Sequence, residues 1–388
     1  MKKVALIVGL AAALGFNNAQ AVELSWKGDV RYRYQSDLTD VTDVTGEHSR
    51  DRHRGRARLG VYPWINEELS GGFQIASGGP IQSTGTNAET TSRNQTFDDA
   101  FHPDAVYLNE YFIDYHPTAL NGNVNVILGK RAVANTLIIQ NDLVWDSDLT
   151  FEGATVQYGK DGNGKEKDGI SAVVGYYPLN EKTGTLTTGA GEQDAYLLVG
   201  QLAYKGEVSD LAYQLGAGYY NYVNYDLKEI AIKSTANYVG KDFNIVEFFG
   251  SFGGQITDTL PWQISGQYAF NTAKNASWVN IDDAKRASYL AELKIGDAKQ
   301  VGQWSLSADY IRIERDALTQ FTDSDRNLGS QVNLKGIKIG GVYHLVQNMT
   351  LGVNYFRFKN IADDPATPAI ESTTNTTHLF MADVVVKF

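Results

Sequence analysis

The segment Ser49–Tyr62, SRDRHRGRARLGVY, carries the clearest structural pattern in the sequence. Arginine occupies every second position in its middle, at Arg52, Arg54, Arg56 and Arg58. Side chains alternate between the two faces of a β-strand, whereas a helix would spread these arginines around its whole circumference. The segment is therefore predicted to be a strand with one basic face and one face of different character.

The same alternation recurs along the chain. In the segment 24–34, for example, tryptophan, valine and tyrosine alternate with lysine, aspartate and arginine. The chain has 22 Tyr, 16 Phe and 38 Gly against 8 Pro, which is typical of membrane barrels with aromatic side chains at both interfaces. Most of the candidate segments reach the roughly 9–11 residues that a tilted strand needs to cross a bilayer. The sixteen candidates are 24–34, 52–62, 69–78, 104–116, 123–131, 150–159, 168–178, 193–205, 208–221, 241–254, 260–271, 286–296, 301–315, 332–345, 348–359 and 377–388.

The connections between these segments alternate in length, which is typical of bacterial outer-membrane barrels with short periplasmic turns and longer extracellular loops. The fold class is therefore predicted to be an all-β, antiparallel transmembrane barrel of sixteen strands, with fourteen or eighteen also compatible. Its polar inner face predicts a lumen that holds water. The long connections are 35–51, 79–103, 132–149, 179–192, 222–240, 272–285, 316–331 and 360–376.

The first residues have the pattern of an export signal. A basic start at Met1–Lys3 precedes an apolar run at 4–14, and Ala19-Gln20-Ala21 fits a signal-peptidase site. Residues 1–21 are therefore predicted to be a signal peptide, and residues 22–388 a single barrel domain. No later segment approaches the roughly 20 unbroken apolar residues of a spanning helix. The predicted location is the bacterial outer membrane.

Composition excludes several classes of function. Without Lys2 and Lys3 the chain has 32 basic residues against 45 acidic ones, and this balance disfavours a nucleic-acid partner. The chain has no cysteine, so it contains neither disulfides nor thiolate metal sites. No pattern for a cofactor is present. The expected partners are outer-membrane lipids and small hydrophilic solutes and ions.

The arginines are expected to face the lumen of the barrel. One arginine on the lipid face costs about 2–4 kcal/mol at the bilayer midplane. Four of them would cost as much as the whole net stability of a typical domain. Arg31 and Arg33 fall on the polar face of the neighbouring segment and are predicted to extend the same basic wall.

The third outside loop, residues 132–149, is predicted to be a constriction loop. It combines apolar residues with Asp142, Asp146 and Asp148, a mixture that an exposed loop does not need. Folded into the barrel, its apolar residues would pack on the wall and its carboxylates would border the water. Opposed charges across a narrow passage create a field that sorts solutes by charge. The six arginines and these three aspartates are therefore predicted to line the pore.

Several segments resemble a family of bacterial outer-membrane porins, similar in architecture to general-diffusion and phosphate-selective porins. They are 54–61, 105–115, 129–130 and above all 141–157, NDLVWDSDLTFEGATVQ. The terminal Phe388 also resembles the assembly signal of such barrels. The resemblance implies sixteen strands, an inward third loop, arginines facing acidic loop residues, and a homotrimer. Phosphate-selective porins have basic residues on the inward loop, whereas this loop is acidic.

Other interpretations remain open at this point. A channel specific for anions or sugars would share the pattern, as would a barrel enzyme or adhesin. A divalent ion on Asp142, Asp146, Asp148 and Glu152 is an alternative to a countercharge. Trp26, Trp262, Trp278 and Trp304 suit interfacial belts, or else an aromatic lining for sugars. The six histidines are scattered without a catalytic motif, so no enzyme is expected. They are His48, His53, His102, His116, His344 and His378.

Overall fold

The computed structural model describes residues 22–40, 48–78, 91–98, 100–101, 103–181, 193–225, 242–274, 285–319, 321–326, 331–361 and 376–388. Sixteen long strands lie in these residues, and each corresponds to one predicted segment. A further two-residue strand, β4 (Gln95–Thr96), pairs with β2. The long strands are β1 (Glu23–Asp40), β2 (His48–Asn66), β3 (Leu69–Ser77), β5 (Val106–Tyr115), β6 (Val124–Ala132), β7 (Thr150–Tyr158), β8 (Gly169–Asn180), β9 (Ala195–Val208), β10 (Leu211–Val223), β11 (Asn244–Thr257), β12 (Leu260–Asn271), β13 (Ala287–Gly296), β14 (Trp304–Ile313), β15 (Leu334–Val346), β16 (Met349–Asn360) and β17 (Thr376–Lys387).

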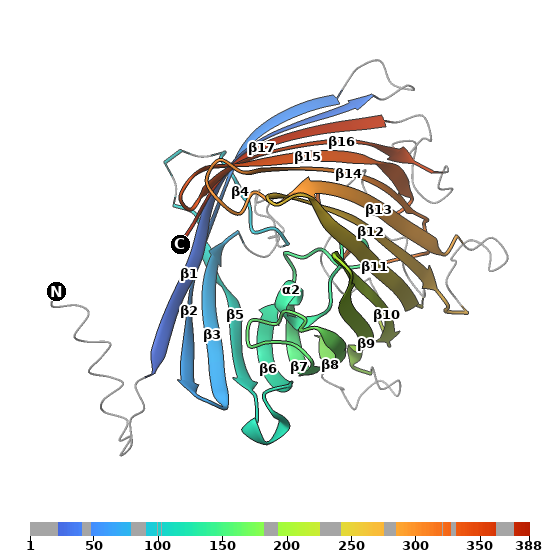
Figure 1. Cartoon of the computed structure of the whole chain (residues 1–388). Helices are drawn as coiled ribbons and strands as arrows, with labels where there is room; N and C mark the ends of the chain where they lie inside the picture. The colour runs from blue at the N-terminus through green and yellow to red at the C-terminus, as the bar shows by residue number, and fades with distance from the viewer. Residues whose placement is uncertain are drawn as a thin grey trace, which may run out of the picture.

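The strands close into a barrel. Each long strand pairs antiparallel with its neighbours in sequence, and β1 also pairs with β17. Asp29 lies opposite Arg58 on one side and Lys387 on the other, so the sheet has no free edge there. Figure 1 shows the strands curving around a space that contains the short helix α2 (Val133–Thr136). The predicted sixteen-stranded, antiparallel, all-β barrel is confirmed.

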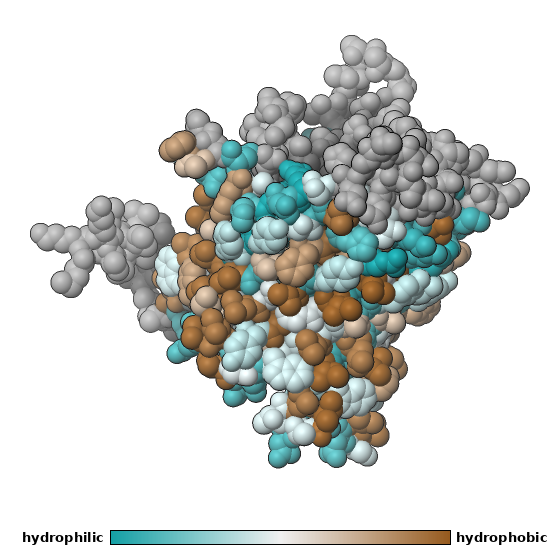
Figure 2. Space-filling view, turned by 90° about the horizontal axis from the view of Figure 1, so that it is seen from above, coloured by the Kyte–Doolittle hydropathy of each residue, from teal (hydrophilic) through white to brown (hydrophobic). Residues whose placement is uncertain are grey.

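The outer face of the barrel is apolar because alternate side chains point outward. In β9, Leu198 and Leu202 are 40% and 59% exposed, whereas Val199 and Gln201 between them are buried. Figure 2 shows apolar side chains covering much of the outer wall, with hydrophilic ones gathering beneath the residues drawn in grey. No helix in the described residues is long and apolar enough to cross a membrane.

Strands β1 and β2 are longer than predicted, and the connection between them is correspondingly shorter than 35–51. Their pairing continues from Gln35 opposite Arg52 to Thr39 opposite His48. Polar side chains hold this extension, including an ion pair between Arg52 and Asp37. The sequence pattern missed the extension because these residues do not alternate between apolar and polar types.

The lumen is less polar than predicted. Inner-facing side chains of β8 to β14 form an apolar surface that includes Leu197, Ile245, Leu290 and Ile311. The connection between β6 and β7, here called L3 (residues 133–149), packs on this surface. The connection between β14 and β15, called L7 (residues 314–333), contributes Ala317 and Leu318 to the same cluster. The charged wall therefore occupies the opposite side of the barrel, on β1 and β2.

Candidate pore constriction

Six arginines form a basic wall on the inner faces of β1 and β2. Arg31 lies directly opposite Arg56, and Arg33 opposite Arg54. Outward residues such as His53 and Ala57, both exposed, separate the arginines along β2. Four of the six guanidinium side chains are nearly buried, whereas the other two are about a fifth exposed. The basic wall is Arg31, Arg33, Arg52, Arg54, Arg56 and Arg58.

Carboxylates on the neighbouring strands stabilise this wall, because like charges directly opposite each other repel. Asp29 accepts hydrogen bonds from Arg56 Nε at 2.9 Å and from Arg58 Nε at 2.5 Å. Asp383 on β17 accepts two from Arg33, at 2.7 and 2.9 Å. The prediction omitted both aspartates. Their positions in the strand alternation place them on the same face as the arginines, so this signal was present in the sequence.

L3 is anchored by apolar contacts and by hydrogen bonds to its backbone. Trp145, which is 2% exposed, packs its ring against Tyr220 and Phe151 at centroid distances of 5.3 and 4.9 Å. The Gln201 side chain accepts a hydrogen bond from the Ile138 amide at 2.8 Å and donates one to the Ile138 carbonyl at 2.9 Å. The loop is therefore held inside the barrel, as predicted for a constriction loop.

The turn between β7 and β8 supports L3 from the other side. Lys160, which is fully buried, donates to the Leu137 carbonyl at 2.7 Å and pairs with Glu166 at 2.8 Å. Gly164 adopts a positive φ of 80°, and a Cβ there would lie 2.1 Å from the Asn135 carbonyl oxygen. Glycine at this position thus allows close contact between the turn and the start of L3.

Of the three predicted loop aspartates, only Asp148 contacts the basic wall. Its carboxylate lies 3.2 Å from Arg56 Nη1 and 3.4 Å from Arg58 Nη1. Asp142 and Asp146 instead face L7, which the sequence analysis read only as another long connection. Ser324 of L7 donates to Asp146 from its amide at 3.0 Å and from its hydroxyl at 2.8 Å.

L3 and L7 present the same short turn to each other. Both contain Asp-Ser-Asp, at 146–148 and 323–325. In each, the first aspartate accepts a hydrogen bond from the amide of the second, at 2.9 Å in L3 and 3.0 Å in L7, which is an Asx turn. The second aspartate then reaches the basic wall. Asp325 lies 3.3 Å from Arg33, just as Asp148 reaches Arg56 and Arg58.

A buried arginine holds the L7 turn in place. Arg326 is 3% exposed and donates two hydrogen bonds to Asp309 on β14, at 2.8 and 2.9 Å. It also pairs with Asp323 at 3.1 Å. Burial favours the neutral arginine, but these carboxylates outweigh burial and raise the pKa of Arg326. The turn is therefore fixed by a charge that stays positive.

The carboxyls where L3 meets L7 have strongly shifted pKa values. Burial raises the pKa of Asp142 to about 7 and that of Asp146 to about 8, and the charge on Asp323 adds to both shifts. Burial also opposes ionisation of Asp325, but Arg33 and Lys338 outweigh it and lower the pKa of Asp325. The loops therefore combine carboxylates that stay charged with others that titrate near neutrality.

The metal alternative receives no support from the described residues, in which no group of three His, Asp or Glu side chains is placed to hold a metal ion. Glu152 belonged to the group considered for that alternative. It lies on the outer face, where Tyr111 donates to it at 2.5 Å and Lys130 pairs with it at 3.5 Å. Position 152 alternates outward, away from L3.

The described histidines and tryptophans are dispersed. His53 and His378 form hydrogen bonds with tyrosine hydroxyls at the outer face, and the rings of His116 and Trp64 lie tilted with centroids 4.5 Å apart. Trp26 and Trp304 point outward and are 56% and 42% exposed. His102 and Trp278 lie outside the described residues, as does the predicted signal peptide 1–21.

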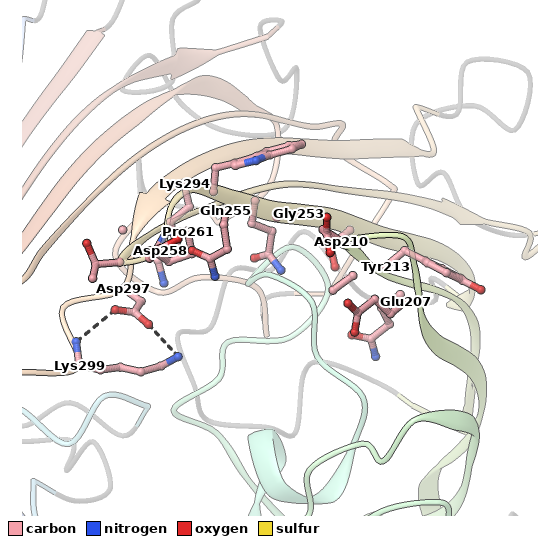
Figure 3. A pocket seen from close by; sticks show the side chains of 18 of the residues that line it. Glu207, Asp210, Tyr213, Gly253, Gln255, Asp258, Pro261, Lys294, Asp297 and Lys299 are labelled. Atoms are coloured by element: carbon pink, nitrogen blue, oxygen red, sulfur yellow. Dashed lines mark hydrogen bonds and ion pairs between the residues drawn. The ribbon is translucent and has the colours of Figure 1, made fainter.

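A hollow lies on the inner face of β9 to β13, at the ends away from the long loops. It has a volume of about 780 Å³ and is lined by charged and amide side chains (Figure 3). Lys205 and Lys294 contribute cations, and Gln214 and Gln263 contribute amides. A lining of this kind is compatible with water below the level of the loops.

Family comparison agrees with this architecture. The family model described as "Putative porin" matches residues 16–248 and 227–388, which together span nearly the whole chain. The chain belongs to this porin family. A comparison with curated protein sequences finds no match. The porin is thus an outer-membrane channel for passive diffusion, and its family and fold are those of channels rather than enzymes.

Solved structures show the same fold. Pseudomonas putida OprB superposes with a TM-score of 0.56 at 12% identity, covering 94% of each chain. An anion-selective porin from Comamonas acidovorans gives 0.52 at 12% identity, covering 95% of this porin and all of the other chain. Acinetobacter baumannii DcaP gives 0.52 at 13%, with coverages of 96% and 99%. At such identities the likeness concerns the fold alone.

Proposed function

We propose that small hydrophilic solutes and ions cross this porin through a constriction between the basic wall and the Asp-Ser-Asp turns of L3 and L7. One observation carries the proposal. Arginines of β1 and β2 meet carboxylates of two separate loops inside a closed barrel, and several of these side chains remain in contact with solvent. Arg58 and Arg52 are 23% and 18% exposed at their side chains, and Asp148 and Asp325 are 29% and 23% exposed.

The charge balance favours weak selectivity. Beside the six arginines stand Asp29, Asp37, Asp148, Asp325 and Asp383, each in contact with one or two of them. Because five aspartates pair with the six arginines, the constriction has little net charge. The electric field between the paired charges therefore acts only on solutes that pass close to them. The rings that stack inside the barrel, Trp145 on Tyr222, are only 2% and 6% exposed and offer little surface to a sugar, which disfavours the sugar-specific alternative.

We also propose that the porin assembles as a homotrimer, on the strength of its family resemblance. The outward ion pair between Lys130 and Glu152 gives support, because charge on a lipid-facing strand is costly and a subunit contact would shield it. Native mass spectrometry of the detergent-solubilised protein should give three times the mass of one chain. A monomer would contradict the assembly without affecting the channel.

Liposome swelling tests the proposed diffusion function. Liposomes containing the porin should swell in iso-osmotic solutions of small sugars, and the rate should fall smoothly with solute size. Stereoisomeric sugars of equal size should enter at similar rates, because the constriction recognises charge and width. Swelling with a single sugar would favour the substrate-specific alternative. Absence of swelling with a correctly folded barrel would refute diffusion.

A further inference from the structure

Cations form a row on the outer face of β14 to β17, at the strand ends that lead into the long loops. Arg312 on β14 lies opposite Lys335 on β15, and Lys335 lies opposite Lys359 on β16. One step closer to the barrel middle, Arg357 on β16 lies opposite His378 on β17. The members of this row come from four separate segments of the sequence, and only the strand pairing brings them together.

Strand alternation fixes the outward direction of these side chains. Leu334 next to Lys335 is fully buried, and Phe356 and Phe358 on either side of Arg357 are 1% and 2% exposed. Arg357 and Lys359 themselves are exposed. The cations therefore lie on the outer face of the barrel and point away from the lumen.

Three of these cations make no ion pair or hydrogen bond within the described part of the chain: Lys335, Arg357 and Lys359, here called the outer basic patch. Arg312 differs, because Glu314 pairs with it at 3.3 Å. Lys335 and Lys359 face each other directly across the ladder, and like charges in that relation are destabilising. An anion from outside the chain would offset this cost.

The height of the patch matches the level of lipid headgroups. Trp304 begins β14 near the short turns, and Arg312 follows eight residues later. At about 3.3 Å per residue and a tilt of 35–45°, this separation is roughly 20 Å along the membrane normal, close to the roughly 25 Å apolar band of such barrels. Exposed Ile337 and Tyr310 lie level with Arg357, one step below Lys335 and Lys359. In Figure 2 hydrophilic side chains likewise border the apolar zone.

The patch is confined to one side of the described barrel. Strands β8 to β13 contain only two lysines, Lys205 and Lys294, and both line the inner hollow of Figure 3. On β6, the outward Lys130 is neutralised by Glu152. A general affinity of the whole rim for anions would not produce this asymmetry, so the outer basic patch is a localised site.

We propose that the outer basic patch binds the phosphate groups of an outer-leaflet lipid whose headgroup carries more than one phosphate. Lys335, Arg357 and Lys359 would contact the phosphates, while the lipid chains lie on the apolar wall beneath. Arginine and lysine bind phosphate through charge-assisted hydrogen bonds, which suits a site at the interface. Each cation near an anionic lipid surface strengthens binding about fivefold. The site is independent of the pore.

The test uses the full-length porin in an uncharged detergent, titrated with a synthetic lipid A that carries two phosphates. Bound lipid is counted by native mass spectrometry. The variant K335Q/R357Q/K359Q should bind on the order of 100-fold more weakly than the wild type. The control K205Q/K294Q/K299Q removes the same charge from the opposite end of the barrel and should bind like the wild type.

Two further measurements separate loss of phosphate binding from loss of lipid-chain binding and from misfolding. A lipid with the same chains and no phosphate should bind wild type and variant equally weakly. Channel conductance of K335Q/R357Q/K359Q should equal that of the wild type, which shows that the barrel is folded. Equal affinity of variant and wild type for the phosphorylated lipid would overturn the proposal. A variant that dissociates into monomers, with no lipid bound to the wild type, would instead show that another copy covers the patch.

Discussion

Replacing Arg52, Arg54, Arg56 and Arg58 by serine is expected to turn the porin toward cations. The substitution removes four positive charges from the basic wall and leaves Asp29 and Asp148 without their main partners. In a tenfold salt gradient the reversal potential should move by tens of millivolts toward the roughly 59 mV limit of an ideal cation channel. Planar-bilayer recordings measure this shift directly.

The controls address folding and position. Uncompensated buried carboxylates are costly, so the fourfold variant carries a risk of misfolding. The single variant Arg58→Ser avoids that risk, because Asp29 keeps its bond to Arg56. It should shift selectivity in the same direction by a smaller amount. K335Q/R357Q/K359Q, which alters outward cations of the same barrel, should leave the reversal potential unchanged. If the reversal potential is unchanged both in the fourfold variant and in Arg58→Ser, the basic wall does not lie on the conduction path.

Raising the pH from 5 to 9 is expected to shift selectivity toward cations without any substitution. Asp142 and Asp146 have pKa values raised to about 7 and about 8, so both are neutral at pH 5 and charged at pH 9. The groups that face them include Asp323, Asp148 and Lys338. Two negative charges thus appear beside the constriction, with a midpoint between pH 7 and 8.

The same titration affects the contact between L3 and L7. The folded protein holds protons on these two carboxyls that the unfolded chain, with a pKa near 3.9, releases. Their contribution to stability is therefore complete below about pH 4 and is lost as the pH rises to about 8.

The variant D142N/D146N tests the predicted change in selectivity. Its reversal potential should become nearly independent of pH between pH 5 and 9. A variant that retains the wild-type pH dependence would assign the titration to other groups.

The strands were predictable because alternation has a physical cause at almost every position. Lipid accepts apolar side chains and the lumen accepts polar ones, so the segment around Arg54 and Arg56 showed its two faces directly. The exceptions are strand faces that contact neither lipid nor the water of the lumen, because a loop covers them. The inner residue Leu197 is apolar because L3 packs on it, so the start of β9, AYLLV at 195–199, reads as a continuous apolar run.

The partners of the basic wall were only partly predictable. Asp148 was identified from its place in a loop of mixed polarity, and it does reach Arg56. The role of L7 was missed, because its apolar and acidic residues are divided between separate stretches. The repeated Asp-Ser-Asp at 146–148 and 323–325 was the available signal. Only the folded structure shows that the two turns meet, since their first aspartates are 177 positions apart in the sequence.

The absence of cysteine from the chain offers a direct test of the water-filled passage. Arg58→Cys places one thiol on the inner face, and Leu59→Cys places one on the adjacent outward residue. With single channels open in a planar bilayer, a bulky, charged, membrane-impermeant thiol reagent should reduce the current of Arg58→Cys in discrete steps and leave that of Leu59→Cys unchanged. A current that responds equally in both variants, or in neither, would contradict conduction past the basic wall.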